Sequence, residues 1–135
     1  MSYAGNVSPT EAFQLLSDDP ATVLIDVRTP AEWSYVGLPD LTGIGKQVVT
    51  ASWHPQLTGD ELKQALTVAG IGPDDRLLFV CRSGQRSQSA ATLATQAGYS
   101  NSYNVSEGFE GHLDTNGQRG NTSGWKFDGL PWRQT

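Results

Sequence analysis

One loop of the sequence combines the residue types of nucleophilic chemistry. The single cysteine, Cys81, opens the segment Cys81-Arg82-Ser83-Gly84-Gln85-Arg86-Ser87 directly after an apolar run. Nearby arginines, backbone amides and a helix N-terminus all favour the reactive thiolate over the thiol. Arg82 and Arg86 supply positive charge, and Gly84 permits the tight backbone path that turns successive amides inward. The loop therefore predicts a thiolate nucleophile that coincides with a cradle for an anion.

These features make Cys81 the candidate catalytic residue. A free cysteine on its own is more often buried and inert, but a glycine, two arginines and a helix start within one short loop favour function. Ser87 also fits the N-cap of a helix that we expect over residues 88–97. The candidate substrate-binding residues are the rest of the loop: Arg82, Ser83, Gly84, Gln85, Arg86 and Ser87.

The elements that must position this loop are also indicated. Strands are predicted over residues 22–27, 47–51 and 76–80, and the first and third contain continuous apolar runs. Such runs are typical of strands covered on both faces, as in a parallel sheet. Ligands of open α/β sheets bind beyond the carboxyl ends of the strands, which is where Cys81 follows residues 76–80.

Three capping boxes predict where helices begin. Each places a hydroxyl residue three positions before a glutamate, over residues 8–11, 29–32 and 58–61. Gly70 and Gly98 are placed to end two helices in the left-handed conformation. Strands alternating with helices predict an α/β fold, a central and mostly parallel sheet flanked by helices on both faces, in a single domain over residues 1–135.

Composition narrows the function classes. The net charge of −5 argues against nucleic acid as a partner, and no run reaches the roughly 20 apolar residues of a membrane span. One cysteine excludes an intramolecular disulfide and fits a reducing compartment, so we expect a cytoplasmic protein. His54 and His112 show no spacing with Cys81 that indicates a metal site or a protease base, and we expect neither metal nor cofactor.

Several segments resemble the rhodanese homology domain. The loop Cys81–Ser87 resembles its active-site loop and is the most specific match. The others are the strand-to-helix block Ile25–Trp33, the dipeptide Gly98-Tyr99, the block Asn104–Gly111 and the ending Gly129–Trp132. The resemblance implies a rhodanese-like α/β fold.

One block departs from the family pattern. Where the family has Gly-His, an apolar residue and Pro-Gly-Ala, this chain has Gly37–Leu41, without the histidine and with a longer connection. We therefore expect Trp53 and His54 to form part of the pocket wall. Asp26 and Arg28 are expected to form a structural pair. Trp125 and Trp132 are expected to pack the Gly-rich tail, residues 108–135, onto the domain.

The resemblance implies a sulfurtransferase. The Cys81 thiolate would take the outer sulfur of thiosulfate or a similar donor as a persulfide and pass it to cyanide, a thiol or a sulfur-accepting protein. Arg82 and Arg86 would hold the small anionic donor. We expect a monomer.

Two alternatives stay open. Cysteine phosphatases of similar fold have a C-x5-R loop, whereas this loop is C-x4-R from Cys81 to Arg86. The second alternative is a persulfide-relay or protein-binding module.

Overall fold

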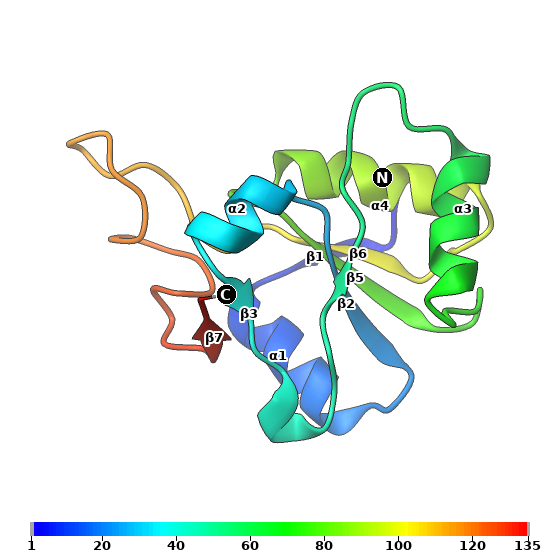
Figure 1. The fold of residues 1–135 in the computed structure, drawn as a ribbon, viewed down its shortest axis with the longest axis horizontal. Coiled ribbons are helices and arrows are strands. Elements are labelled where there is room, and N and C mark those ends of the chain that lie inside the picture. The colour runs from blue at the N-terminus through cyan, green and yellow to red at the C-terminus, as the bar shows by residue number, and fades with distance from the viewer. Residues whose placement is uncertain (1, 135) are drawn as a thin grey trace.

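The computed structural model describes residues 2–134 and shows an α/β fold (Figure 1). The strands are β1 (Gly5–Val7), β2 (Thr22–Asp26), β3 (Leu38–Pro39), β4 (Val49–Thr50), β5 (Arg76–Val80), β6 (Ser102–Val105) and β7 (Trp132–Arg133). The helices are α1 (Pro9–Asp18), α2 (Pro30–Tyr35), α3 (Gly59–Val68), α4 (Gln85–Gln96) and the short 3-10 helix η1 (Thr42–Ile44). No helix among residues 2–134 is long and apolar enough to cross a membrane.

The central sheet has five strands in the order β1-β6-β5-β2-β4, and all of its pairs are parallel. Strands β2 and β5 pair along their whole length, from Thr22 opposite Arg76 to Asp26 opposite Val80. Their carboxyl ends therefore meet at one edge of the sheet. Cys81 follows immediately after β5 at this edge, as the sequence predicts.

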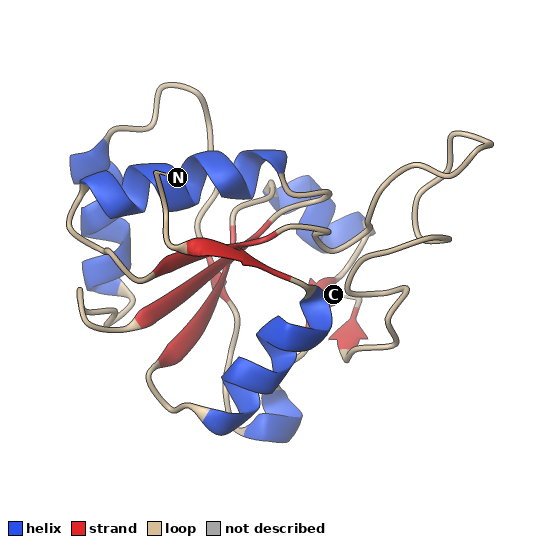
Figure 2. Ribbon diagram, turned by 180° about the vertical axis from the view of Figure 1, so that it is seen from behind, coloured by secondary structure: helices blue, strands red, loops and turns tan. Residues whose placement is uncertain are grey.

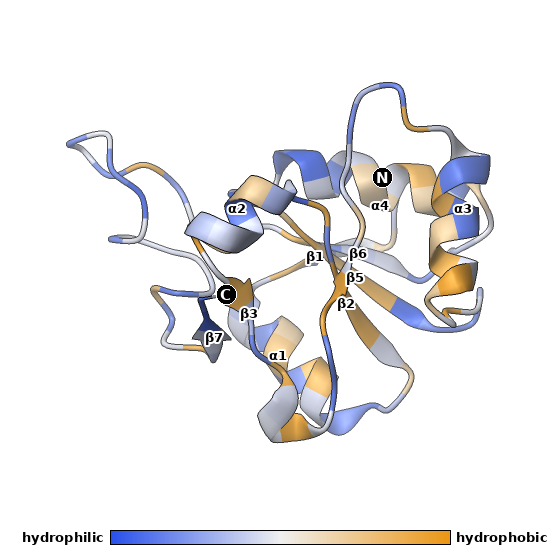
Figure 3. Ribbon diagram, viewed as in Figure 1, coloured by the Kyte–Doolittle hydropathy of each residue, from blue (hydrophilic) through white to orange (hydrophobic). Residues whose placement is uncertain are grey.

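Helices cover both faces of the sheet (Figure 2). Helices α3 and α4 pack on one face over Leu77 and Phe79, and α1 packs on the other over Leu78 and Val80. Successive side chains of a strand point to opposite faces, so the continuous apolar run of β5 fills both cores. Figure 3 shows the same strands as the apolar centre of the molecule. The predicted fold class is confirmed.

The three capping boxes are confirmed at the starts of α1, α2 and α3. Gly70 and Gly98 have positive φ angles directly after the C-caps of α3 and α4, also as predicted. The prediction for α4 was wrong at its start. This helix begins at Gln85 with Gly84 as its N-cap, so Ser87 lies within the first turn and is not the cap.

Four strands were not predicted. Hydrophobicity does not predict strand β6, because Ser102 and Asn104 interrupt its apolar residues, although both side chains are buried. Strands β3 and β7 lie far apart in the sequence and form a small antiparallel sheet. The two segments approach closely, since a Cβ at Gly37 would lie 2.7 Å from the Arg133 carbonyl oxygen. The predicted strand over residues 47–51 is reduced to β4.

The tail returns to the domain through its tryptophans. Trp125 is fully buried against α1, where it makes an edge-to-face contact with Phe13. Trp132 lies in β7 and is 40% exposed, and the Lys126 Nζ lies over its ring at 3.9 Å from the ring centroid. The expected packing is thus strong for Trp125 and partial for Trp132. Between Gly111 and Gly124 the chain projects as the long orange loop of Figure 1.

Candidate active site

Cys81 lies beneath a tight loop at the carboxyl end of β5, with 1% of its surface exposed. The Gly84 amide donates a hydrogen bond to the Cys81 Sγ over 3.1 Å. Gly84 has a φ of 106°, and a Cβ there would collide with the Ser106 carbonyl oxygen. Both facts require glycine at this position. The predicted role of Gly84 in closing the loop is therefore confirmed in its geometry.

The segment after β6, residues 109–111, forms backbone hydrogen bonds with the start of the Cys81 loop. The Phe109 amide donates to the Cys81 carbonyl oxygen at 2.8 Å, and the amides of Glu110 and Gly111 donate to the Arg82 carbonyl oxygen at 3.0 and 3.1 Å. These bonds engage the carbonyl oxygens of Cys81 and Arg82. The first amides of α4 have no helical partner, as at any helix N-terminus. The backbone donor that reaches the sulfur is the Gly84 amide.

Ser87 supplies a second donor to the nucleophile. Its side chain is fully buried, and its Oγ lies 3.2 Å from the Cys81 Sγ and 2.6 Å from the Asn104 Oδ1. Donors aimed at a sulfur stabilise the thiolate more than the thiol. Ser87 therefore belongs to the site through its hydroxyl. Asn104 is its neighbour, and it was not predicted from the sequence as a site residue.

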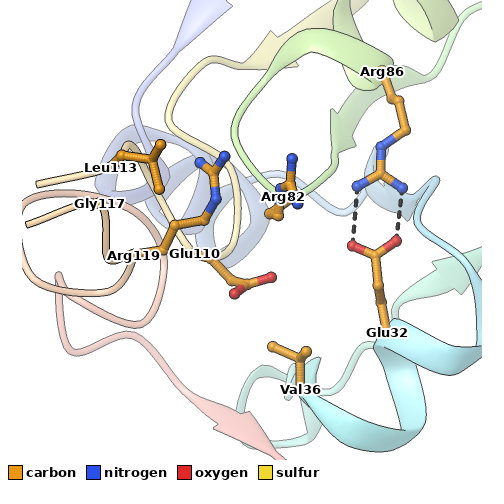
Figure 4. A pocket seen from close by; sticks show the side chains of 8 residues that line it. All are labelled: Glu32, Val36, Arg82, Arg86, Glu110, Leu113, Gly117 and Arg119. Atoms are coloured by element: carbon orange, nitrogen blue, oxygen red, sulfur yellow. Dashed lines mark hydrogen bonds and ion pairs between the residues drawn. The ribbon is translucent and has the colours of Figure 1, made fainter.

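Arg86 is tied to α2 and is not a free anion ligand. Its Nη1 and Nη2 atoms donate to the Glu32 Oε1 and Oε2 atoms at 2.7 and 3.0 Å (Figure 4). Partial burial alone would raise the pKa of Glu32, but hydrogen bonds from Arg86 and the Thr29 amide outweigh it and lower the pKa to about 2. The hydrogen bonds to Glu32 raise the pKa of Arg86 in turn. The pair is ionised and locks the loop to the start of α2.

A cleft of about 730 Å³ opens beside the loop. The Arg82 side chain is exposed and makes no hydrogen bond or ion pair with any residue from 2 to 134, while the Arg119 side chain donates to the Gly111 carbonyl oxygen at 2.8 Å. Three arginines and two glutamates face the same space, which suits a small anion. The lining residues are Glu32, Val36, Arg82, Arg86, Glu110, Leu113, Gly117 and Arg119 (Figure 4).

The remaining predicted residues contribute less. The side chains of Ser83 and Gln85 form no hydrogen bond with the described part of the chain, and neither lines the cleft. The prediction that Trp53 and His54 form part of the pocket wall was wrong, because neither residue lines the cleft. Trp53 borders a separate hollow beside α4. The sequence offered no signal for Arg119, which reaches the cleft from the projecting tail loop.

Asp26 and Arg28 form the structural pair that was expected. Their side chains are fully buried and meet at 2.7 Å. Arg28 also donates to the Gly37 carbonyl oxygen and lies over the Phe109 ring at 4.4 Å from its centroid. This pair connects β2 to the segments on either side of the site.

Sequence comparisons place this geometry among known proteins. A family model described as the STR4 middle domain matches residues 4–135. An uncharacterized protein of Rickettsia conorii, RC0915, is 38% identical over 128 residues, which cover 95% of this chain and 96% of that protein. The thiosulfate:glutathione sulfurtransferase of Saccharomyces cerevisiae is 35% identical over 86 residues, which cover 62% of this chain and 58% of that enzyme.

Solved structures agree with the sequence matches. The crystal structure of Rv0390 from M. tuberculosis superposes with a TM-score of 0.84 at 46% identity and covers 98% of this chain and 99% of that one. The polysulfide-sulfur transferase homodimer from Wolinella succinogenes superposes with a TM-score of 0.67 at 26% identity, over 99% of this chain and 80% of that one.

Proposed function

We propose, from the premise that this chain belongs to the STR4 middle-domain family and has a rhodanese-like fold, that it transfers sulfane sulfur through a persulfide on Cys81. The donor is thiosulfate or a similar small anion, and the acceptor is a thiophile such as cyanide, a thiol or a protein. One observation carries the proposal. The chain's single cysteine sulfur lies within hydrogen-bond distance of the Gly84 amide and the Ser87 hydroxyl, in a loop whose arginines face an open cleft.

The reaction divides into two displacements. In the first, the Cys81 thiolate attacks the outer sulfur of thiosulfate, a new S–S bond forms, and sulfite leaves with the electron pair of the broken S–S bond. In the second, the acceptor attacks the outer persulfide sulfur, and Cys81 leaves as the thiolate. No external oxidant or reductant is needed, because each sulfur–sulfur bond that breaks is balanced by one that forms to sulfur or to carbon.

The residues have distinct tasks in this scheme. The Gly84 amide and the Ser87 hydroxyl stabilise negative charge at the Cys81 sulfur. Arg82 and Arg119 hold the anionic donor and the departing sulfite, because their guanidinium groups face the cleft without a carboxylate ion pair. Arg86 lines the same cleft, but its bidentate pair with Glu32 makes it chiefly a brace of the loop.

The loop length separates sulfur transfer from phosphate-ester hydrolysis. Four residues lie between Cys81 and Arg86, and Arg86 is already held by Glu32. The space above the sulfur therefore suits one sulfur atom better than a phosphoryl group, which needs donors for three oxygens. This geometry favours sulfurtransferase over the phosphatase alternative.

The test is a pair of assays on the same preparation. Thiosulfate:cyanide sulfur transfer should be measurable, and hydrolysis of an aryl phosphate should be negligible. Cys81→Ser, a nearly isosteric change, should abolish transfer and leave the fold intact. Inserting one glycine after Gly84 should reduce transfer, because a displacement of about 1 Å costs on the order of a hundredfold in rate. Efficient phosphate hydrolysis without sulfur transfer would reverse the assignment.

A further inference from the structure

A chain of hydrogen-bonded polar side chains starts at the nucleophile, and none of its members lines the cleft. It reaches Ser87 on α4, continues to Asn104 on β6, and ends at Asn6 on β1. Ser87 is fully buried and Asn104 is 3% exposed. Buried polar groups carry a cost unless they are hydrogen-bonded, so their protons must be accounted for one by one.

The orientation of the Asn104 amide is fixed by its neighbours. Its Nδ2 lies 3.2 Å from the Gly84 carbonyl oxygen and 3.2 Å from the Asn6 Oδ1. A backbone carbonyl oxygen can only accept, so the amino group of Asn104 must face it. The Oδ1 atom of Asn104 consequently faces Ser87 and needs a donor.

Ser87 has one hydroxyl proton and two acceptors. The Asn104 Oδ1 is at 2.6 Å and the Cys81 Sγ at 3.2 Å. While Cys81 is a thiol, all three groups are satisfied if the thiol proton points to the Ser87 Oγ and the Ser87 proton points to Asn104. Once the sulfur is a thiolate, it has no proton to offer, and it attracts the Ser87 proton more strongly than the neutral thiol does, so that the proton can turn from Asn104 to the sulfur. Asn104 then loses its donor.

We infer that Asn104 is a positioning residue that competes with the nucleophile for the hydroxyl proton of Ser87. The Ser87 proton rests on Asn104 in the thiol and turns to sulfur in the charged states of Cys81. Asn104 thereby sets how readily the charged sulfur forms, without touching the substrate. This inference depends on Cys81 being the nucleophile of the proposed function, but its test below requires no sulfur transfer.

The sign of the effect follows from the proton count. Replacing Asn104 with leucine removes the competing acceptor, so thiolate formation should move to lower pH by about half to one pH unit, the size of one hydrogen bond. Replacing Ser87 with alanine removes the donor to sulfur, so thiolate formation should move to higher pH. In the Ser87→Ala background, Asn104→Leu should have no further effect, because no hydroxyl remains to be shared.

The experiment follows the ultraviolet absorbance of the thiolate against pH, with Cys81→Ser as the blank. The single cysteine makes the signal unambiguous. Ser89→Ala is the matched control, because that hydroxyl lies on the same helix and bonds only to the Gln85 carbonyl oxygen among the described residues. It should leave the midpoint unchanged.

A milder variant keeps the test decisive if Asn104→Leu does not fold. Asn6 is exposed, and its Oδ1 accepts from the Asn104 Nδ2 and from the Tyr3 hydroxyl, so Asn6→Ala should loosen the Asn104 amide and give a smaller shift in the same direction. The inference is overturned if the folded Asn104 or Asn6 variant shows no shift or an upward shift. It is also overturned if the Asn104 effect persists without Ser87.

Discussion

Two of the arginine–carboxylate pairs near the site, Arg28–Asp26 and Arg86–Glu32, differ in what surrounds them. Arg28 and Asp26 meet at 2.7 Å with both side chains 0% exposed. Arg86 and Glu32 meet at the same distance, but with 30% and 21% of their side chains exposed. Both pairs join a guanidinium group to a carboxylate, and they differ most in burial and in the further partners of the arginine.

The buried pair cannot exchange partners. Arg28 is held by Asp26, by the Gly37 carbonyl oxygen and by the Phe109 ring, and no solvent can replace any of them. The half-buried pair faces the cleft, where an anionic ligand can compete with Glu32 for the guanidinium of Arg86. We conclude that the first pair fixes the fold around the site, and that the second ties the fold to the loop.

The largest effect on the free energy of unfolding is expected at the buried pair, Arg28 and Asp26. Arg28→Met should lower the free energy of unfolding by about 3–5 kcal/mol, because it leaves the buried Asp26 carboxylate with a backbone amide donor but without a counter-charge. Urea unfolding followed by circular dichroism measures it. The double variant Asp26→Leu with Arg28→Met should recover part of the loss, since no unpaired charge remains. A single variant as stable as the wild type would contradict the assigned role.

An arginine without any carboxylate partner gives the intermediate case. Arg82→Ala should raise the KM for thiosulfate about tenfold, the value of one charge-assisted contact. Its unfolding free energy should change by less than about 0.5 kcal/mol, because the side chain is exposed and touches no partner among residues 2–134. Arg133→Ala, away from the cleft lining, serves as the matched loss of charge. An equal rise in KM in both variants would indicate a general field and not a contact.

The half-buried pair is expected to contribute much less to stability than the buried pair. The pKa of Glu32 is about 2 in the fold against 4.5 without its partners, so the unfolded chain binds its proton more readily. The stabilisation is complete above pH 4.5 and is lost as the pH falls from 4.5 toward 2. Glu32→Gln should therefore cost about 1 kcal/mol or less at neutral pH and flatten this part of the stability profile.

Glu61 offers a control for that prediction. It has the same capping-box role in α3 as Glu32 has in α2, but no arginine among residues 2–134 bonds to it. Glu61→Gln should change the profile less than Glu32→Gln. Equal profiles for the two variants would show that Arg86 adds nothing to the cap.

The sequence could predict the loop because its signals are local. An apolar strand, a cysteine, a glycine and two arginines are adjacent in the chain, and they are adjacent in the fold. The partner of Arg86 could not be predicted, because Glu32 lies 54 residues away and already had a local explanation as a capping residue. Asn104 was also missed as a site neighbour. Its polar side chain interrupts an apolar strand, and only the packing of β6 against α4 shows that it meets Ser87.

The persulfide on Cys81 is the central claim, and intact mass measures it directly. The protein is incubated with thiosulfate, freed of excess donor and weighed, with Cys81→Ser treated in parallel. We expect one added sulfur on the wild type, removed again by cyanide, and none on the variant. An unchanged mass with thiosulfate and with polysulfide, while Cys81 stays reduced and alkylatable, would contradict it.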